Sequence, residues 1–143
     1  YMLAMNTFTM NTSMNPFENT LSSDKLFNKQ AEVIQEIADK DDCIIVGRCA
    51  GYILRDEPKC VRIYISADKD FRTKRIMASD HLDEKEAQKK IHSMDKKRDS
   101  YFGYYAGQDW KACHTYDLSI STSALGIDKA VDLICQYIDI KFK

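Results

Sequence analysis

Arginine side chains are the groups in this sequence whose positions suggest chemistry. Arg48 follows Gly47 at the end of the apolar run CIIVG, so it is expected at the carboxyl end of a buried strand. Arg72 and Arg75 are three residues apart, which places them on one face of a helix. Open α/β sheets bind ligands beyond the carboxyl ends of their strands, and a guanidinium group pairs well with phosphate. The positions of these arginines therefore predict a local anion-binding site.

Arg98 interrupts an apolar line along a helix that is expected over residues 83–105. The line steps by three and four residues through Ala87, Ile91, Met94, Arg98, Tyr101 and Tyr105. An unpaired guanidinium on a covered helix face is costly, so Arg98 should meet a carboxylate or a bound anion. Asp95, three residues earlier, is a carboxylate within reach. Two plainer alternatives stay open: Arg98 extends past the edge of the line into solvent, and Arg72 and Arg75 form a solvated basic face.

The composition limits the partners of this site. The 143 residues are 44% hydrophobic with a net charge of −1, so we expect one soluble domain without general attraction to nucleic acid or anionic membrane. The five cysteines include no C-x-x-C pair and the three histidines lack zinc-binding spacing, which indicates reduced thiols, no metal site and a cytoplasmic protein. Residues 1–14 are predicted to be neither a signal peptide nor a membrane span.

The spacing of apolar residues predicts helices that alternate with strands. Strands are expected at 43–48, 61–66 and 116–122. Helices are expected at 25–40, 67–79, 83–105 and from 126 onward, with a short helical turn at 49–54. This alternation predicts an α/β architecture in which helices cover both faces of a parallel sheet.

Four segments together resemble the cytidylate kinase-like branch of the P-loop nucleoside monophosphate kinases. They are IIVGRCAGYILRD, VRIYISADKDFRTKRIM, DKKRDSYFGYYAGQDW and YDLSISTSALGIDKAVDLI. The resemblance, which covers most of residues 20–140, implies a three-layer α/β/α fold with a parallel sheet, and one kinase-like domain over 1–143 with a lid at about 83–113. It implies ATP-dependent phosphoryl transfer, with Mg²⁺, to a nucleoside monophosphate such as CMP or dCMP. Nucleotides are then the expected partners, and a homo-oligomer is compatible with this expectation.

The resemblance also implies roles for individual residues. Substrate-binding roles fall to Gly47, Arg48 and Asp95, catalytic roles to Arg72, Arg75 and Arg98, and contact with the adenine of the donor to Ser121, Thr122 and Gly126. Two positions depart from the family pattern. Cys49 stands where the family has an aspartate beside the acceptor, and Ile91 stands where the lid pattern has its first arginine.

The phosphate-binding motif of these kinases, G-x-x-x-x-G-K-[ST], is absent from the sequence. In the family it lies upstream of everything matched here, so an N-terminal strand, loop and helix of about 30 residues or more are expected to be missing. Their loss should leave an exposed sheet edge or an unfilled groove, and this chain alone should be inactive. Two alternatives stay open: a binding or regulatory module of the same fold that has lost its P-loop, and a kinase for another small metabolite.

Overall fold

The computed structural model describes residues 16–143, with side chains described from Ser22 onward. The prediction for residues 1–14 lies outside the described residues. The chain divides into two compact units, Tyr1–Cys60 and Val61–Lys143, and each is described by itself. In the part of the chain that was searched, no helix is both long and apolar enough to cross a membrane.

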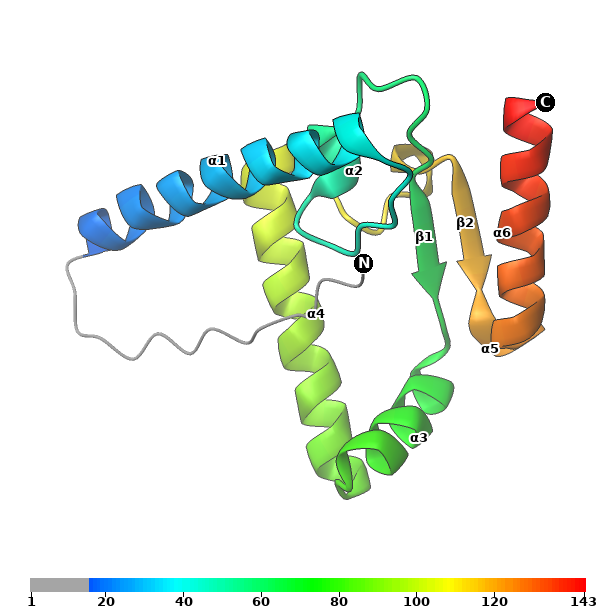
Figure 1. Cartoon of the computed structure of the whole chain (residues 1–143). Helices are drawn as coiled ribbons and strands as arrows, with labels where there is room; N and C mark the ends of the chain where they lie inside the picture. Colours follow the sequence, from blue (N-terminus) through cyan, green and yellow to red (C-terminus); the bar gives the residue numbers. More distant parts are fainter. Residues whose placement is uncertain (1–15) are drawn as a thin grey trace. The chain divides into compact units, whose positions relative to one another are not determined.

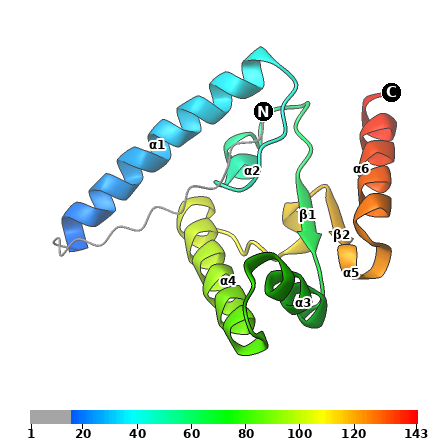
Figure 2. The ribbon, with the colours of Figure 1, turned by 60° about the horizontal axis from the view of Figure 1, so that its bottom comes forward.

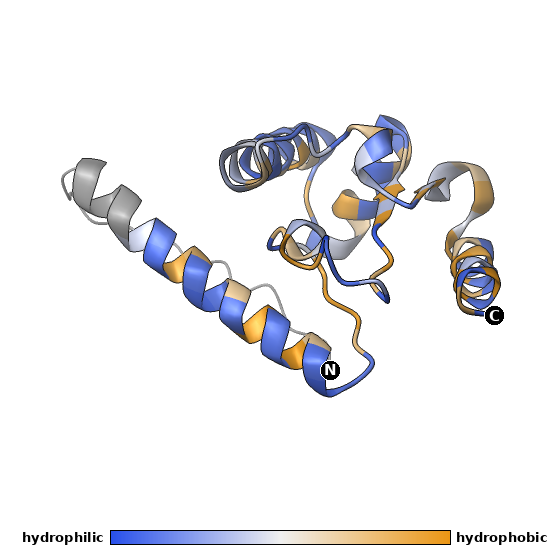
Figure 3. Cartoon of the chain, turned by 90° about the horizontal axis from the view of Figure 1, so that it is seen from above, coloured by the Kyte–Doolittle hydropathy of each residue, from blue (hydrophilic) through white to orange (hydrophobic). Residues whose placement is uncertain are grey.

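The first unit contains one long and one short helix. Helix α1 (Pro16–Lys40) is longer at its N-terminal end than the predicted helix over 25–40, and α2 (Ala50–Ile53) lies within the predicted turn at 49–54. Along α1 single hydrophobic positions are separated by hydrophilic ones (Figure 3), and Ile34 is its buried residue. The helix is therefore amphipathic with a narrow apolar face.

The strand predicted over 43–48 is wrong. Residues 42–46 form no strand or helix, and no strand pairs with them in the described part of the chain. The side chains of Ile44 and Val46 are 85% and 65% exposed. A continuous apolar run favours a buried strand, but a strand forms only where a neighbouring strand accepts and donates its ladder hydrogen bonds.

The second unit contains a small parallel sheet, which gives it a mixed α/β fold. Strand β1 (Ile63–Ser66) pairs with β2 (Leu118–Ser121) (Figure 1). The register aligns Ile63 with Leu118, Tyr64 with Ser119, Ile65 with Ile120 and Ser66 with Ser121. The parallel pairing predicted for 61–66 and 116–122 is confirmed, with shorter strands.

The sheet described here has two strands instead of the three predicted. β2 is the sole partner of β1 in the described residues, so one edge of β1 is unpaired there, because the strand predicted at 43–48 does not form. The side chain of Ile120 on β2 is 4% exposed, whereas that of Ile65 on β1 is 57% exposed. The sheet is therefore unevenly covered.

Helices connect and follow the two strands. They are α3 (Lys69–Asp80), α4 (Glu84–Ala106), the short 3₁₀ helix η1 (Cys113–Thr115), α5 (Thr122–Leu125) and α6 (Ile127–Phe142). α3, α4 and α6 each begin one or two residues after the predicted start. α3 and α4 contact each other and meet at the turn between them, from which they diverge in Figure 1, and Figure 2 shows the same pair from another side.

Local sequence signals set the turn of the α3–α4 hairpin. His81 ends α3 in the left-handed region with φ of 55°. Asp83 then caps α4: its carboxylate accepts a hydrogen bond from the backbone N–H of Glu86, while the Glu86 carboxylate accepts one from the backbone N–H of Asp83. On the first turns of α4, Ala87 and Ile91 are buried. The turn and the apolar residues therefore hold α3 against α4.

An ion pair joins the segments that lead into β1 and β2. The Asp117 carboxylate accepts hydrogen bonds from the backbone N–H of Arg62 at 2.7 Å and from its Nε and Nη2 at 3.2 and 3.1 Å. In return, the backbone N–H of Asp117 donates to the carbonyl of Arg62 at 2.8 Å. Lys141, near the end of α6, lies 3.9 Å from the same carboxylate. The hydrogen bonds and charge of Arg62 hold the pKa of Asp117 below its usual range although burial opposes this.

We predict that Asp117→Asn destabilises the chain by about 1 to 2 kcal/mol at pH 7, because a charged hydrogen-bonded pair that is only partly shielded from water is lost. The pKa of Asp117 is depressed in the folded state, so its contribution is present above the unfolded pKa of about 4 and is lost as pH falls through the lower folded value. Urea unfolding at pH 7 and near pH 3 measures both effects. Asp132→Asn, at an exposed position of α6, is the control. Equal stability of the two variants at pH 7 would contradict the prediction.

Candidate active site

A cluster of three charged side chains joins α3 to α4. Arg72 of α3 donates from Nη1 and Nη2 to the two carboxylate oxygens of Asp95 on α4, at 2.8 and 2.7 Å. Arg98, one turn further along α4, donates from Nη1 to Asp95 Oδ1 at 3.1 Å. We call Arg72, Asp95 and Arg98 the ion cluster. The prediction that Arg98 meets a carboxylate is confirmed, whereas the two-pronged pairing of Arg72 with Asp95 was not predicted.

The charges of the ion cluster do not balance. Burial alone would raise the pKa of Asp95, but the hydrogen bonds and charge of Arg72, and then the charge of Arg98, outweigh burial and lower this pKa. Asp95 is therefore ionised at neutral pH, and two guanidinium groups share one carboxylate. The side chain of Asp95 is 18% exposed and that of Arg98 is 44% exposed. One positive charge of the cluster is therefore left for an anion that approaches from solvent.

The two guanidinium groups are engaged to different degrees. Both terminal nitrogens of Arg72 donate to Asp95, so its orientation is fixed. Arg98 donates from one nitrogen, and no other hydrogen bond of its side chain is present among the described residues. Arg98 therefore keeps N–H groups that could donate hydrogen bonds to an anion, whereas the terminal nitrogens of Arg72 already donate to Asp95.

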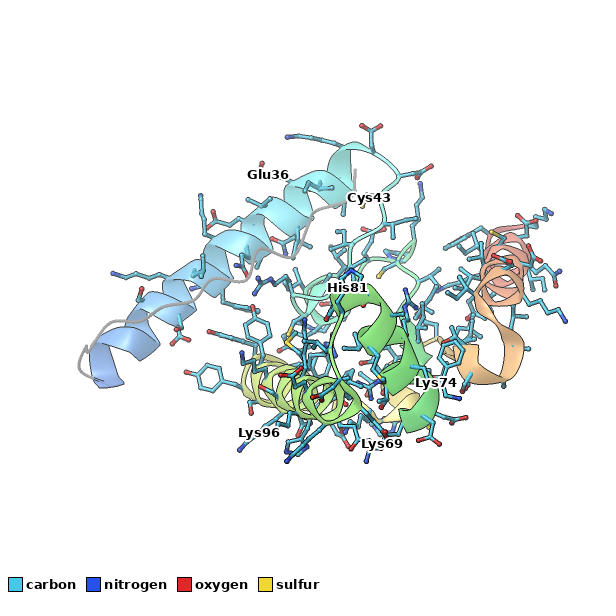
Figure 4. All side chains as sticks on the ribbon, turned by 90° about the horizontal axis from the view of Figure 1, so that it is seen from below. Glu36, Cys43, Lys69, Lys74, His81 and Lys96 are labelled. Atoms are coloured by element: carbon cyan, nitrogen blue, oxygen red, sulfur yellow. The ribbon has the colours of Figure 1, made fainter. Side chains whose placement is uncertain are left out.

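Arg75 does not join the ion cluster. It is exposed on α3, and in the described part of the chain its side chain has no hydrogen bond or ion pair. Lys74 beside it and Lys96 on α4 are likewise exposed (Figure 4). For Arg75 the geometry agrees with a solvated basic face, the plainer alternative that the sequence left open.

An aromatic block, which we define as Tyr64, Trp110 and Tyr116, lies between the sheet and the ion cluster. The ring of Tyr64 on β1 meets Trp110 edge-on at 5.5 Å and stacks on Tyr116 at 5.1 Å. The Tyr116 hydroxyl donates to the backbone carbonyl of Trp110 at 2.6 Å. The Arg98 guanidinium carbon lies 6.0 Å from the centre of the Trp110 ring. Burial and then the charge of Asp95 raise the pKa of Tyr64.

Sequence reasoning assigned no role to the aromatic block. The signal available was Trp110, the single tryptophan of the chain, which follows the glycine that ends α4. Tyr64 also stands inside the predicted strand, where an aromatic side chain packs well on a pleated surface. Neither signal indicates which residue each ring contacts, because the contact between Tyr64 and Trp110 joins positions far apart in the sequence.

Hydroxyl groups connect the carboxyl ends of β1 and β2, where the donor loop at 121–126 was predicted. Thr122 donates to the backbone carbonyl of Ser66 at 3.1 Å, and its side chain is buried. The hydroxyls of Ser121 and Ser123 are 3.0 Å apart, and Ser123 accepts from the backbone N–H of Asp68 at 3.1 Å. The hydroxyl of Thr122 is therefore used within the fold.

Gly126 ends this loop and precedes α6. Its φ of 81° and ψ of 168° form a conformation that side chains with a Cβ rarely adopt, so glycine is needed here. The predicted loop is a short helix, α5, between Ser121 and this glycine. The segment remains a candidate nucleotide contact because it follows a strand end, the usual position of ligands in open parallel sheets.

The predicted acceptor residues lie in a strained turn of the first unit. Gly47, Arg48 and Cys49 have φ of 77°, 55° and 56°, and only the first of them is a glycine. The backbone N–H of Ala50 donates to the carbonyl of Gly47 at 3.1 Å and closes the turn. A non-glycine residue in this region costs about 1 to 3 kcal/mol and is often found where function requires it. Arg48 is exposed, so the turn presents its side chain to solvent.

Cys49 is a structural residue of this turn. Its side chain is 5% exposed, and burial raises the pKa of its thiol to about 11. The thiol is therefore protonated at neutral pH and acts as a small apolar side chain. It supplies no carboxylate in place of the aspartate that the family has here.

The described residues do not form a site that could hold Mg²⁺ or the phosphates of ATP. No set of three His, Cys, Asp or Glu side chains in the searched part of the chain could bind a metal ion. The sequence also lacks the glycine-rich loop and lysine that surround the phosphates of a nucleoside triphosphate.

Comparison with known proteins supports a kinase family. The profile of the cytidylate kinase-like family matches residues 1–124. Cytidylate kinases of Sulfolobus acidocaldarius and Desulfurococcus amylolyticus are 31% and 29% identical over 72% and 74% of the chain, and the chain covers 56% and 57% of their lengths. A crystal structure of an uncharacterized protein from Eubacterium ventriosum is 37% identical with a TM-score of 0.79, over 81% of this chain and 73% of that one. The chain thus belongs to the cytidylate kinase-like family.

Proposed function

We propose that the protein is a nucleotide kinase that transfers a phosphoryl group from ATP to a nucleoside monophosphate, with CMP or dCMP as the acceptor. The ion cluster carries this proposal, because it presents a partly unpaired guanidinium beside a fixed carboxylate. Relatives named cytidylate kinase support it. The chain spans 56 to 59% of the length of these relatives, so activity and substrate are assigned to the whole protein.

The roles proposed for the arginines follow from their surroundings. Arg48 is exposed on the strained turn, where it would bind the phosphate of the acceptor. Arg98 would stabilise the charge that spreads over the phosphoryl oxygens during transfer, because it keeps free donors. Asp95 and Arg72 are positioning residues: their two-pronged pair holds α4 against α3 and sets the place of Arg98.

The donor side of the reaction is proposed in outline. ATP, with Mg²⁺, would supply the phosphoryl group, and a P-loop would have to hold its phosphates. Ser121, Thr122 and Gly126 would lie beside the donor base, with Thr122 acting through the backbone because its hydroxyl is occupied. For the fold, we propose the three-layer α/β/α arrangement of P-loop kinases. The chain would then form one kinase-like domain over 1–143, with a lid at about 83–113.

A second candidate function is a nucleotide-binding module without turnover. The absence of G-x-x-x-x-G-K-[ST] from the sequence favours it, since no glycine-rich phosphate cradle is then available. That this chain alone is inactive stays a prediction. Assaying CMP phosphorylation by the complete gene product, and by this chain alone, distinguishes the two functions.

We predict that Arg98→Ala in the complete gene product lowers kcat for CMP phosphorylation by about 10²- to 10³-fold, the effect of losing one donor to developing charge. The KM values for CMP and ATP should change little, because the interaction strengthens mainly in the transition state. Arg98→Lys should restore little activity, since an ammonium cannot replace a planar fork. Steady-state kinetics with both substrates varied give these constants.

Lys96→Ala is the matched control for this experiment. Lys96 is an exposed cation on the same helix, two residues away, and lies outside the ion cluster (Figure 4). Its removal should leave kcat within about twofold, because exposed charges that make no fixed contact contribute little. If Arg98→Ala keeps wild-type kcat, or loses activity only in proportion to its unfolded fraction, the catalytic role of Arg98 is excluded.

A separate prediction concerns Arg48, whose two variants should weaken CMP binding alike but differ from each other in stability. Arg48→Ala and Arg48→Gly should both weaken CMP binding by about 1.5 to 3 kcal/mol, the range for a hydrogen bond to a charged group. Arg48→Gly should also be more stable than Arg48→Ala by about 1 kcal/mol, because glycine adopts a positive φ without strain.

Titration calorimetry with CMP and urea unfolding measure the two quantities for Arg48. Lys59→Ala, at an exposed position in the same unit, controls for loss of one positive charge. Unchanged CMP affinity in both Arg48 variants would show that this arginine is not an acceptor ligand. Equal stability of the two variants would show that the turn is not strained.

A further inference from the structure

Trp110 is fixed more firmly than its place in a loop would suggest. It lies between α4 and η1, where Tyr64 of β1 contacts the ring edge-on and the Tyr116 hydroxyl binds the backbone carbonyl of Trp110. The rings of Tyr64 and Tyr116 stack on each other, so these contacts support one another. The indole ring is therefore held in a defined place relative to the sheet.

The indole nitrogen of Trp110 is buried, and no acceptor for its N–H is present among the described residues. A buried donor without a partner is unfavourable, and a phenylalanine at this position would avoid that cost. Packing alone therefore does not explain the choice of tryptophan. What tryptophan offers beyond phenylalanine is the aromatic face with the strongest attraction for a cation.

Two cations lie over the Trp110 ring. The guanidinium carbon of Arg98 is 6.0 Å from the ring centre and the Lys111 ammonium is 5.6 Å from it. Both distances are within, or at the outer limit of, the range in which a cation is attracted to a ring. Lys111 is exposed and neighbours Trp110 in sequence, whereas Arg98 comes from α4 and already binds Asp95. Trp110 thus connects the ion cluster to the sheet.

The hydrogen bond to Asp95 does not by itself fix the orientation of the Arg98 guanidinium, and the Trp110 ring adds a second contact. A single N–H···O bond lets the guanidinium of Arg98 rotate about it, and Asp95 cannot follow because Arg72 holds both of its oxygens. The face of Trp110 is a second surface that limits this rotation. With both contacts, the unused donors of Arg98 have a preferred direction; with Asp95 alone they do not.

We propose that Trp110 is a positioning residue that orients Arg98 for phosphoryl transfer by holding its guanidinium group against the indole face. This inference rests on the proposed kinase function and adds to it a residue that does not touch the substrate. The indole reports on the contact directly, because Trp110 is the single tryptophan of the sequence.

The first test is a double-mutant cycle in the complete gene product, with CMP, ATP and Mg²⁺. Trp110→Leu should lower kcat about tenfold and leave the KM for CMP within twofold, because the guanidinium is misdirected while acceptor binding is intact. Trp110→Phe should lose less, since a weaker aromatic face remains. In an Arg98→Met background, Trp110→Leu should cause no further loss, because there is no guanidinium left to orient.

The second test is the fluorescence of Trp110 in this chain, without any reaction. Arg98→Met should change the emission intensity or wavelength, because a cation leaves the indole face. Lys96→Met, which removes an exposed cation of the same helix, should leave the emission unchanged (Figure 4). Circular dichroism and urea unfolding of each variant show whether the fold is retained.

The outcomes separate this inference from the proposed function. Loss of kcat by Trp110→Leu that disappears in the Arg98→Met background, together with the emission change, supports the positioning role. An equal loss in both backgrounds, or no loss in either, overturns it while the kinase function stands. If the wild-type gene product phosphorylates no nucleotide, the proposed function fails and the positioning role fails with it, whatever the fluorescence shows.

Discussion

Asp95 accepts hydrogen bonds from two guanidinium groups that come from different helices, and the geometry of the candidate site depends on this carboxylate. Its two-pronged bond with Arg72 fixes α4 against α3, and its single bond with Arg98 places that side chain at the edge of the pair. One negative charge cannot neutralise two positive ones, so the cluster carries a net positive charge. The same carboxylate thus stabilises the fold and leaves one cation available.

The parallel pairing of β1 and β2 imposes the second constraint. Arg62 and Asp117 join the segments before the two strands, and the register then brings Ser66 and Ser121 to the same edge of the sheet. That edge carries the hydroxyl groups and the start of the loop that leads to Gly126. A shift of β2 by one residue would turn its buried Ile120 outward, so the position of the segment after β2 depends on the pairing.

The contacts and elements that depend on local residue spacing could be predicted from the sequence. Arg98 and Asp95 are one turn apart, so their contact follows from helix geometry, and the helices between β1 and β2 favour a parallel pair. The partner of Arg72 could not be predicted, because Asp95 lies on another helix. Nothing in the sequence indicated that Arg72, and not Arg75, is the arginine that pairs with a carboxylate. The strand expected at 43–48 failed for a related reason: an apolar run shows a preference for extended backbone but not whether a neighbouring strand is present.

The two units present their arginines by different physical means. The backbone that carries Arg48 is held by the left-handed dihedral angles of the strained turn, so the Cα–Cβ bond of this residue has a set direction. The direction of Arg98 follows from one hydrogen bond and one ring contact, both of which can break and re-form at small cost. Binding a ground-state phosphate is best served by a group that is already in place, whereas developing charge is best met by one that moves onto it. The proposed division of roles, with Arg48 for the acceptor and Arg98 for transfer, agrees with this difference in rigidity.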